Sequence, residues 1–436
     1  MDMTQSRRIA LTAAAFGTLA LALPLTWRAG EPPVLLFAVS YQWLQVSMKV
    51  FHANFLGVAV GSMDFFARTE FVTWLSLGGL LVLAAGMRLA TLGLKTSGPN
   101  QAAGELSRFS LERLWIFYAA FLAGKEVIYA IAWRATGLTQ ALLALAGLRW
   151  FFFFLFAFGV FTRRRRYDLL GLAVLLEVLL GFTGFFSVFK EIFFALLIAY
   201  LTARPRLGAR SGLTVAGFMA AVMALGVLWM TVRGDYRTYV NQGERSQVVR
   251  IELFDRAGHM LSMLSAIDRS ALEGGLELLA ERMAYVDYFA VAALHVPARF
   301  PYENGALWGA AIEHVLKPRI LFPDKQVLLS DSELTMKYTG LGLASGSEGT
   351  SISLGYFAES YIDFGPWGMM VPIFLVGAAW GLIYRYFLSR RIAATYAFAA
   401  AVTVLMGANQ FEVYSVKLVG GVLTTFLVFA AWVRWG

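Results

Sequence analysis

Long apolar runs alternate with short polar loops along most of the chain, and this pattern predicts a bundle of membrane-spanning helices. A helix needs about 20 apolar residues to cross the hydrocarbon core of a bilayer. Residues 9–27 meet this length and no small-residue cleavage site follows them, so we interpret them as a span rather than a signal peptide. We expect about eleven spans, at residues 9–27, 34–58, 71–94, 112–133, 139–162, 167–184, 187–203, 211–232, 366–388, 392–411 and 417–434.

Arginines in the short loops indicate which loops face the cytoplasm. The strongest clusters are residues 163–166, then Arg204, Arg206 and Arg210, then Arg390 and Arg391. Two expected spans separate each cluster from the next, so all three clusters are expected on the cytoplasmic side. The span 211–232 then runs outward, which places the long segment 233–365 outside.

The sequence therefore predicts an all-α, polytopic membrane protein with three regions. Residues 1–232 form an N-terminal bundle of about eight spans, and residues 366–436 add about three more. Residues 233–365 form one large extracytoplasmic, mostly helical segment. Its apolar stretches are too short to span and favour amphipathic helices on the outer leaflet, at residues 260–265, 283–294 and 306–312. The run SDSE at 330–333 is typical of a helix-capping box.

One feature of the charge pattern conflicts with this topology. Counting back from the arginines at 163–166 places the N-terminus outside, whereas Arg7 and Arg8 favour the inside. Four consecutive arginines outweigh two. The alternative is that residues 138–149 form an interfacial helix, which would change the number of spans.

Composition agrees with a membrane protein and excludes several kinds of site. The 436 residues are 58% hydrophobic and 15% charged, which excludes a soluble enzyme. The chain has no cysteine and four histidines, so we expect no disulfide, metal site or cofactor. The segment 233–365 has 12 Lys and Arg against 17 Asp and Glu, and the remainder has 25 against 11. The net charge of +9 therefore reflects membrane topology, not nucleic-acid binding.

Several basic residues are candidates for binding an anion at the membrane surface. Arg233 and Arg237 follow the span 211–232 and share one face if its helix continues. Two neighbouring guanidiniums of this kind are suited to binding a phosphate. Lys190 lies about one turn inside the span that begins near 187. Intramembrane ionisable residues usually line a cavity, although a lysine paired with Glu191 or a headgroup is the simpler interpretation. Further residues of this kind are Lys125, Glu126 and Glu177.

The segment 313–325, EHVLKPRILFPDK, combines His314 with three cations, Lys317, Arg319 and Lys325. Pro318 and Pro323 favour an extended backbone between them, so a rigid cationic turn is expected. Such a turn suits a pyrophosphate, and its structural alternative is a rim that anchors the protein to lipid.

Acidic and aromatic residues of the outer segment are candidates for contacting a sugar. Glu359 and Asp363 are four residues apart and share one helical face, so either carboxylate is suited to a general base or to binding a sugar hydroxyl. The structural alternative is a capping or ion-pair role at the entry to the span 366–388. Arg282, Tyr285 and Tyr288 are also expected on one helical face, where the rings suit sugar stacking or an interface anchor.

The chain has many expected spans and one large outer segment late in its sequence. With the stretches PRILFPDK and GYFAESYIDFGPWGMM within residues 318–370, it resembles the O-antigen polymerase (Wzy-like) family of oligosaccharide repeat unit polymerases. The resemblance implies a metal-independent glycosyltransferase with a polyprenyl-pyrophosphate-linked glycan as donor and acceptor, in the bacterial cytoplasmic membrane. Expected partners are the lipid bilayer, a chain-length regulator and a flippase. The resemblance also implies that four residues of this stretch line the family's substrate pocket: Arg319, Lys325, Glu359 and Gly365.

We therefore assign hypothetical roles to the candidate residues. Pyrophosphate contacts are expected from Arg319, Lys325, Arg237, Arg233, Lys190 and Arg282. The general base is expected among Glu359, His314 and Asp363, and sugar contacts among Tyr236, Tyr285 and Tyr288. Three alternatives stay open: an O-antigen ligase, a lipid-linked oligosaccharide flippase or transporter, and a non-catalytic scaffold.

Overall fold

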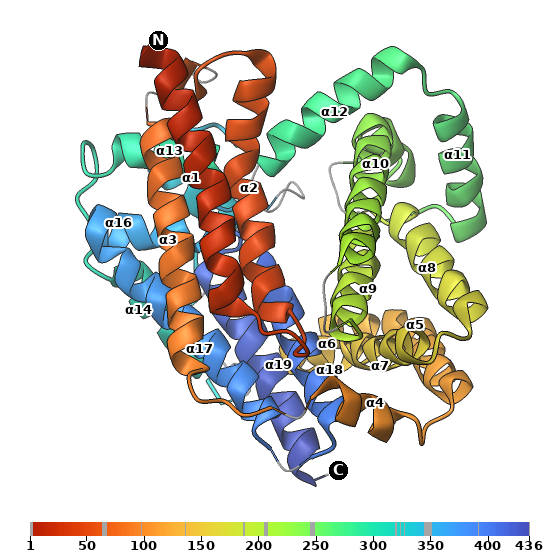
Figure 1. Ribbon diagram of the computed structural model, residues 1–436. Helices are drawn as coiled ribbons and strands as arrows, with labels where there is room; N and C mark the ends of the chain where they lie inside the picture. The colour runs from red at the N-terminus through yellow and green to blue at the C-terminus, as the bar shows by residue number, and fades with distance from the viewer. Residues whose placement is uncertain are drawn as a thin grey trace.

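A computed structural model shows an all-helical protein (Figure 1), with no strand among the residues that it describes. The described residues are 3–62, 68–96, 98–135, 137–185, 188–204, 208–244, 249–318, 321–322, 324–326, 328–343, 351–390 and 392–435.

Within these residues, eight helical segments are long and apolar enough to cross a membrane. They are α1 (Met3–Thr26), α2 (Val34–Leu56), α3 (Thr69–Ala90), α5 (Leu111–Arg134), α6 (Thr139–Ala146) continued by α7 (Leu148–Arg163), α10 (Ala209–Val240), α17 (Met370–Leu388) and α19 (Ser415–Trp435). Three more expected spans are helices of only 12 to 16 residues, namely α8 (Tyr167–Phe182), α9 (Lys190–Thr202) and α18 (Ala394–Leu405). The total of eleven stays a prediction.

The remaining helices are short and most belong to the expected outer segment. They are α4 (Pro99–Leu106), α11 (Leu253–Ser265), α12 (Arg269–Met283), α13 (Val286–His295), α14 (Ala306–Leu316), α15 (Asp331–Thr339) and α16 (Tyr356–Gly368), with 3-10 turns η1 (Val60–Ser62) and η3 (Met406–Asn409). The predicted capping box is confirmed at α15. The Ser330 hydroxyl accepts from the backbone N–H of Glu333, whose carboxylate accepts from the backbone N–H of Ser330.

Contacts between helix ends show which loops lie together. Arg385 near the end of α17 donates to Leu92 O, 2.8 Å away, just beyond α3. Arg163 at the end of α7 donates to Phe109 O, 2.9 Å away, between α4 and α5. At the start of α18, the Thr395 hydroxyl donates to Ala102 O in α4. The ends of α3, α7 and α17 and the start of α18 therefore lie at one end of the molecule.

The N-terminus lies at the opposite end. Arg8 donates to Gly57 O, 2.8 Å away, at the end of α2. Arg28, which follows α1, donates instead to Leu94 O beyond α3. Helix α1 thus runs from the far end toward the end that holds Arg163, and Figure 1 shows the two termini at opposite ends. An odd number of spans between the N-terminus and Arg163 agrees with this arrangement, and the side of the membrane on which each end lies stays a prediction.

Glycines bring helices α3 and α17 into backbone contact. A Cβ on Gly377 would overlap the carbonyl oxygen of Leu83, and one on Gly86 would overlap that of Phe374. Gly377 and Gly381 are four residues apart on α17, the small-residue spacing that allows close helix packing in membranes. In Figure 1, these two helices stand in one group with α1 and α2, and α9 and α10 belong to a second group.

We expect Gly377→Ala to destabilise the protein because the added methyl group meets rigid backbone, not a flexible side chain. Overpacking of this kind costs roughly 1–3 kcal/mol of unfolding free energy. Gly78→Ala on α3 is the matched control, since no atom lies within 4 Å of its added Cβ. Thermal unfolding in detergent should separate the two variants, and equal midpoints would contradict the described packing.

Candidate functional site

A cavity of about 650 Å³ lies between the group of helices that includes α1 and α2 and the group that includes α9 and α10. Helices α1 and α2 form one wall, α9 and α10 form the other, and the end of α12 and the loop before α19 contribute further residues. Most of the lining is apolar, including Leu36, Phe37, Leu44, Phe194, Leu197, Met219, Val222 and Met223. The chemistry of the site therefore depends on the few charged residues among them.

Four cations line this cavity: Lys190, Arg233, Arg237 and Arg282. Helix α10 continues to Val240, so Arg233 and Arg237 stand one turn apart on one helix face, as the sequence predicted conditionally. Arg237 Nε donates to Phe185 O at 3.1 Å, and its guanidinium lies 4.8 Å from the centre of the Phe185 ring.

The three arginines lie close enough together to repel one another electrostatically. Arg282 lies 5.6 Å from the centre of the Tyr285 ring. Among the described residues, no carboxylate forms an ion pair with Arg233 or Arg282. A cluster of like charges at one place in a cavity favours the binding of an anion.

Lys190 begins α9 and directs its charge toward the cavity instead of toward its neighbour in sequence. Its Nζ lies 3.1 Å from the Tyr41 hydroxyl and 5.4 Å from the centre of that ring. Glu191 pairs with Arg149 on α7, at 3.3 Å. The simpler interpretation, a Lys190–Glu191 pair, is therefore not what the structure shows.

Arg149 also holds a second carboxylate inside the bundle. Its Nη1 lies 3.7 Å from Glu177 on α8, and the Tyr118 hydroxyl on α5 donates to the same carboxylate at 3.2 Å. Both Arg149 and Glu177 are buried. Lys125 lies 3.8 Å from Glu126, next to it in the chain. The network therefore gives Glu177 two partners, Arg149 and Tyr118.

Glu412 is the other carboxylate of the cavity, and sequence reasoning missed it. It accepts a hydrogen bond from the side-chain amide of Gln45 on α2. The only sequence signal was its place in the loop between two expected spans, where a polar residue is ordinary. The fold turns this loop inward, toward the cavity.

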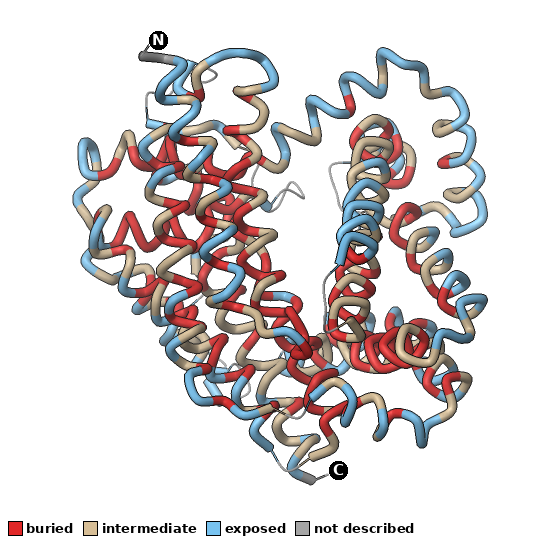
Figure 2. Tube along the Cα trace, viewed as in Figure 1, coloured by how far each residue is buried: buried red, intermediate tan, exposed pale blue. Residues whose placement is uncertain are grey.

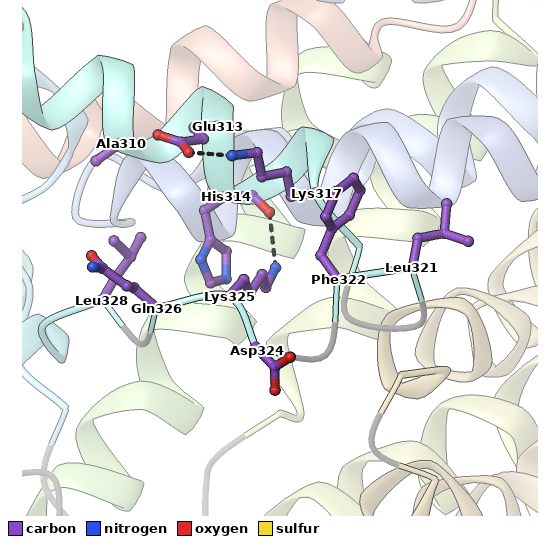
Figure 3. Close-up of a pocket in the computed structure, with 10 residues that line it drawn as sticks. All are labelled: Ala310, Glu313, His314, Lys317, Leu321, Phe322, Asp324, Lys325, Gln326 and Leu328. Carbon is purple, nitrogen blue, oxygen red and sulfur yellow. Dashed lines mark hydrogen bonds and ion pairs between the residues drawn. The ribbon is translucent and has the colours of Figure 1, made fainter.

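A second hollow, also of about 650 Å³, lies beside α14 (Figure 3). Lys325 donates to His314 O at 2.9 Å, and Lys317 pairs with Glu313 at 2.5 Å. The structure thus gathers His314, Lys317 and Lys325 as expected. The two hollows share no lining residue among those that the structure describes. The predicted pyrophosphate residues therefore divide between two places, and Arg319 lies outside the described residues.

Comparison with known proteins places the chain in a family. A family described as "Domain of unknown function (DUF8712)" matches residues 94–433. The chain belongs to this family. No curated protein and no solved structure matches it. The DUF8712 match includes α9, α10, α12 and Glu412, so it spans the charged part of the cavity, whereas the α1 and α2 wall precedes it.

Two candidate bases of this DUF8712 chain are buried away from both hollows. Glu359 is fully buried and accepts from the backbone N–H of Ser415, 3.2 Å away, and from its hydroxyl. Asp363 accepts from the backbone N–H groups of Leu307, at 3.0 Å, and Trp308, at 2.9 Å, and so caps α14. Both carboxylates thus hold structural hydrogen bonds, but at the starts of α19 and α14 and not at the entry to the span 366–388, where the alternative role had been expected.

The three candidate sugar-binding tyrosines of the DUF8712 chain have different surroundings. Tyr236 is fully buried and its hydroxyl donates to Thr183 O at 2.9 Å. Tyr285 lines the cavity, and the Tyr288 ring centre lies 5.9 Å from that of Tyr285. The expected single helical face was wrong for Arg282, Tyr285 and Tyr288. Helix α12 ends at Met283 and α13 begins at Val286, so the chain turns between them.

Burial gives Glu359 a testable effect on pH stability. Burial raises the pKa of Glu359 from 4.5 to about 8, while hydrogen bonds from Ser415 oppose the shift. Between these values the folded protein keeps a proton that the unfolded chain has lost, so raising the pH favours unfolding. The stability present below pH 4.5 declines by about 1.4 kcal/mol per pH unit until the pH passes the folded value.

We expect the Glu359→Gln variant to lose this decline in thermal midpoint between about pH 6 and pH 8. Glu277→Gln, an exposed carboxylate on α12, should retain the wild-type slope. Unfolding followed in detergent at several pH values measures both. A Glu359→Gln slope equal to wild type would contradict the buried environment of this carboxyl.

The described residues offer no metal centre beside these groups. Among them, no group of three or more His, Asp or Glu side chains is placed to hold a metal ion. The ionisable side chains described in the cavity lining are four cations, two carboxylates and two tyrosines, Tyr41 and Tyr285.

Proposed function

We propose that this protein is a membrane glycosyltransferase that joins polyprenyl-pyrophosphate-linked oligosaccharide repeat units. The observation that supports this proposal is a single cavity with a long apolar lining and four cations, Lys190, Arg233, Arg237 and Arg282. A polyprenyl pyrophosphate has the matching chemistry, because an apolar chain is joined directly to a multiply charged anion. A soluble sugar nucleotide would leave the apolar lining without a partner.

Helix α10 gives a lipid a route into this cavity. Its side chains are mostly exposed or half-buried along its length, as Figure 2 shows, although its sequence is strongly apolar. In a bilayer, such a surface contacts acyl chains. A lipid-linked donor can therefore enter between α2 and α10 while its headgroup reaches Arg233 and Arg237.

The proposed topology places these arginines at the outer side of the bacterial cytoplasmic membrane. It counts α8, α9 and α18 as spans in addition to the eight longer ones, for eleven in all. The basic loop at 163–166 then faces the cytoplasm. Arg233 and Arg237, near the opposite end of the outward-running α10, face the outer leaflet, where the repeat units are joined.

The proposed reaction needs charge stabilisation more than any other assistance. An acceptor hydroxyl oxygen forms a bond to the anomeric carbon, and the bond from that carbon to the pyrophosphate oxygen breaks. The leaving pyrophosphate takes the bonding electron pair and gains negative charge. An arginine keeps its charge at any physiological pH, and one guanidinium can donate to two phosphate oxygens. Arg233, Arg237 and Arg282 therefore stabilise the charge of the leaving pyrophosphate, with Lys190 beside them.

The residues of the α14 hollow are not part of this pyrophosphate site. Lys317 and Lys325 both have partners within the hollow, Glu313 and the His314 carbonyl, and its described lining has no residue in common with the cavity. We therefore assign the donor headgroup to the cavity alone. A chain-length regulator and a flippase remain proposed partners.

The direct test is incubation of the purified protein with a synthetic lipid-linked repeat unit, followed by gel electrophoresis of the glycan. A ladder that rises in steps of one repeat supports a polymerase. Transfer of one unlengthened glycan to an added lipid or protein acceptor instead indicates a ligase. No transfer to any acceptor would contradict both glycosyltransferase assignments.

A transporter of lipid-linked oligosaccharides is the second candidate. The observation that favours it is the ionic network of Arg149, Glu177 and Glu191 inside the helical bundle, since ionisable groups there often line a transport path. Reconstitution with a fluorescent lipid-linked glycan distinguishes the two functions. A transporter moves the label across the vesicle membrane without changing the length of the glycan.

A further inference from the structure

The chain between α18 and α19 leaves helical geometry inside the protein. Helix α18 has 12 residues, which at 1.5 Å per residue extend about 18 Å, well short of a bilayer core of about 30 Å. The chain continues through η3 and a non-helical stretch before Ser415 begins α19. Phe411 and Asn409 in this connection are buried. Irregular backbone at such depth is tolerated where it is buried in protein or lines a cavity.

Two glutamine side chains of α2 form hydrogen bonds with backbone groups of this connection. Gln42 donates to Ala408 O at 3.2 Å, and Gln45 accepts from the backbone N–H of Phe411 at 3.0 Å. Both glutamines are buried, and the Tyr356 hydroxyl donates to the Gln42 oxygen at 2.7 Å. Buried amides one turn apart on α2 therefore hold the connection in one conformation.

The same arrangement aims Glu412 into the cavity. The Gln45 oxygen is used by Phe411, so its amide group is turned to donate to the Glu412 carboxylate. Glu412 lines the cavity and lies close enough to Lys190 and Tyr285 to interact electrostatically with both. Tyr285 in turn lies near Arg282, so this carboxylate borders the cation cluster.

Of the two described carboxylates in the cavity lining, Glu412 is the one that an arginine does not hold. Glu191, the other one, pairs with Arg149. Glu359 and Asp363 line neither hollow, and each accepts backbone hydrogen bonds. Gln45 leaves part of the Glu412 carboxylate, which has several acceptor positions, open to another donor.

We propose that Glu412 is the general base of the glycosyl transfer, an inference that rests on the proposed function. The acceptor hydroxyl gives its proton to the Glu412 carboxylate as its oxygen bonds to the anomeric carbon. The bond to the pyrophosphate oxygen breaks, and the electron pair leaves with the pyrophosphate beside the arginines. The proton on Glu412 then passes to solvent. No oxidant or reductant is needed for this step.

Separate measurements of donor binding and of turnover test this assignment. We expect Glu412→Gln, which is nearly the same size, to lower kcat at least about 100-fold. Its dissociation constant for radiolabelled polyprenyl pyrophosphate should stay within about threefold of wild type, because the cation cluster is intact. Glu277→Gln on the exposed face of α12 is the control and should match wild type in both measurements.

Glu412→Asp provides a second test of the general-base role if the glutamine variant folds poorly. It retains a carboxylate that is one methylene shorter, so it should fold and transfer at an intermediate rate. Turnover of Glu412→Gln within threefold of wild type would overturn the assignment, as would a folded aspartate variant that is no faster than the glutamine variant. Equal losses of binding and turnover would also overturn it, because Glu412 would then be a donor-binding residue.

Failure of the inference differs from failure of the proposed function. If the wild-type protein transfers no glycan from a lipid-linked donor, the proposed function fails and the role of Glu412 fails with it. If wild type is active and the Glu412→Gln variant is equally active, the function stands and only the base is wrong.

Discussion

Replacing Arg233 and Arg237 together by glutamine should abolish the binding of polyprenyl pyrophosphate and the polymer synthesis that depends on it. Each guanidinium makes charge-assisted hydrogen bonds to phosphate that contribute about 1.5–3 kcal/mol, which corresponds to a 10- to 150-fold change in affinity. The pair stands one turn apart on α10 beside Arg282. We therefore expect each single variant to lose at least about 10-fold in affinity and the double variant at least about 100-fold.

The fold should survive these changes, because Arg237→Gln keeps an amide donor in place of the guanidinium that bonds to Phe185 O. Among the described residues, Arg233 forms no ion pair that its loss would disrupt. Arg269→Gln is the matched control, because its side chain is 93% exposed on α12 and its partner is Glu273, outside the cavity. Binding of radiolabelled polyprenyl pyrophosphate and the thermal midpoint are measured for each variant. A double variant that is folded and binds within threefold of wild type would remove the arginines from the site.

The second large effect is expected on stability, from Arg149→Met. This change leaves Glu177 and Glu191 without their arginine inside the helical bundle. Removing one partner of a buried ion pair typically costs about 3–5 kcal/mol, because the remaining charge stays buried without compensation. We expect a large fall in the thermal midpoint and a poor yield of monodisperse protein.

The cause of that loss can be separated from simple loss of packing. Adding Glu177→Gln and Glu191→Gln to Arg149→Met removes the stranded charges and should restore most of the midpoint. Arg166→Met is the control, since its ion pair with Glu112 is partly exposed and such pairs contribute about 1 kcal/mol or less. A triple variant as unstable as Arg149→Met would show that the shape of the arginine, not its charge, stabilises the bundle.

Helix positions could largely be predicted from the sequence because apolar runs of membrane length have few other solutions. The expected span 211–232 lies within α10, and 71–94 overlaps α3 almost completely. Helix α10 extends beyond its apolar run through residues 233–240, which are more polar and were not expected to belong to the span. The break between α12 and α13 at Tyr285 could not be predicted, since residues 283–294 read as one apolar stretch.

The candidate site was predictable only in part. Lys190, Arg233, Arg237 and Arg282 were each selected from sequence, yet their common cavity depends on α12 packing against α10 and α2. The motif stretch 318–370 led instead to the α14 hollow and to the buried α16 carboxylates. Glu412 was missed because its role depends on Gln45, 367 residues earlier in the chain. Contacts between residues so far apart in the chain cannot be recognised from the local sequence.

The most direct test asks where the pyrophosphate lipid binds, and the absence of cysteine from the chain makes it simple. Ser40→Cys places one thiol in the lining of the cavity, and Gln326→Cys places one in the α14 hollow. Alkylation of each variant is measured with and without polyprenyl pyrophosphate, and with the polyprenol as a control. We expect the pyrophosphate to protect the thiol of Ser40→Cys and the polyprenol to protect it far less. The thiol of Gln326→Cys should react at an unchanged rate. Protection of the thiol in the α14 hollow, with free reaction of the one in the cavity, would contradict this expectation.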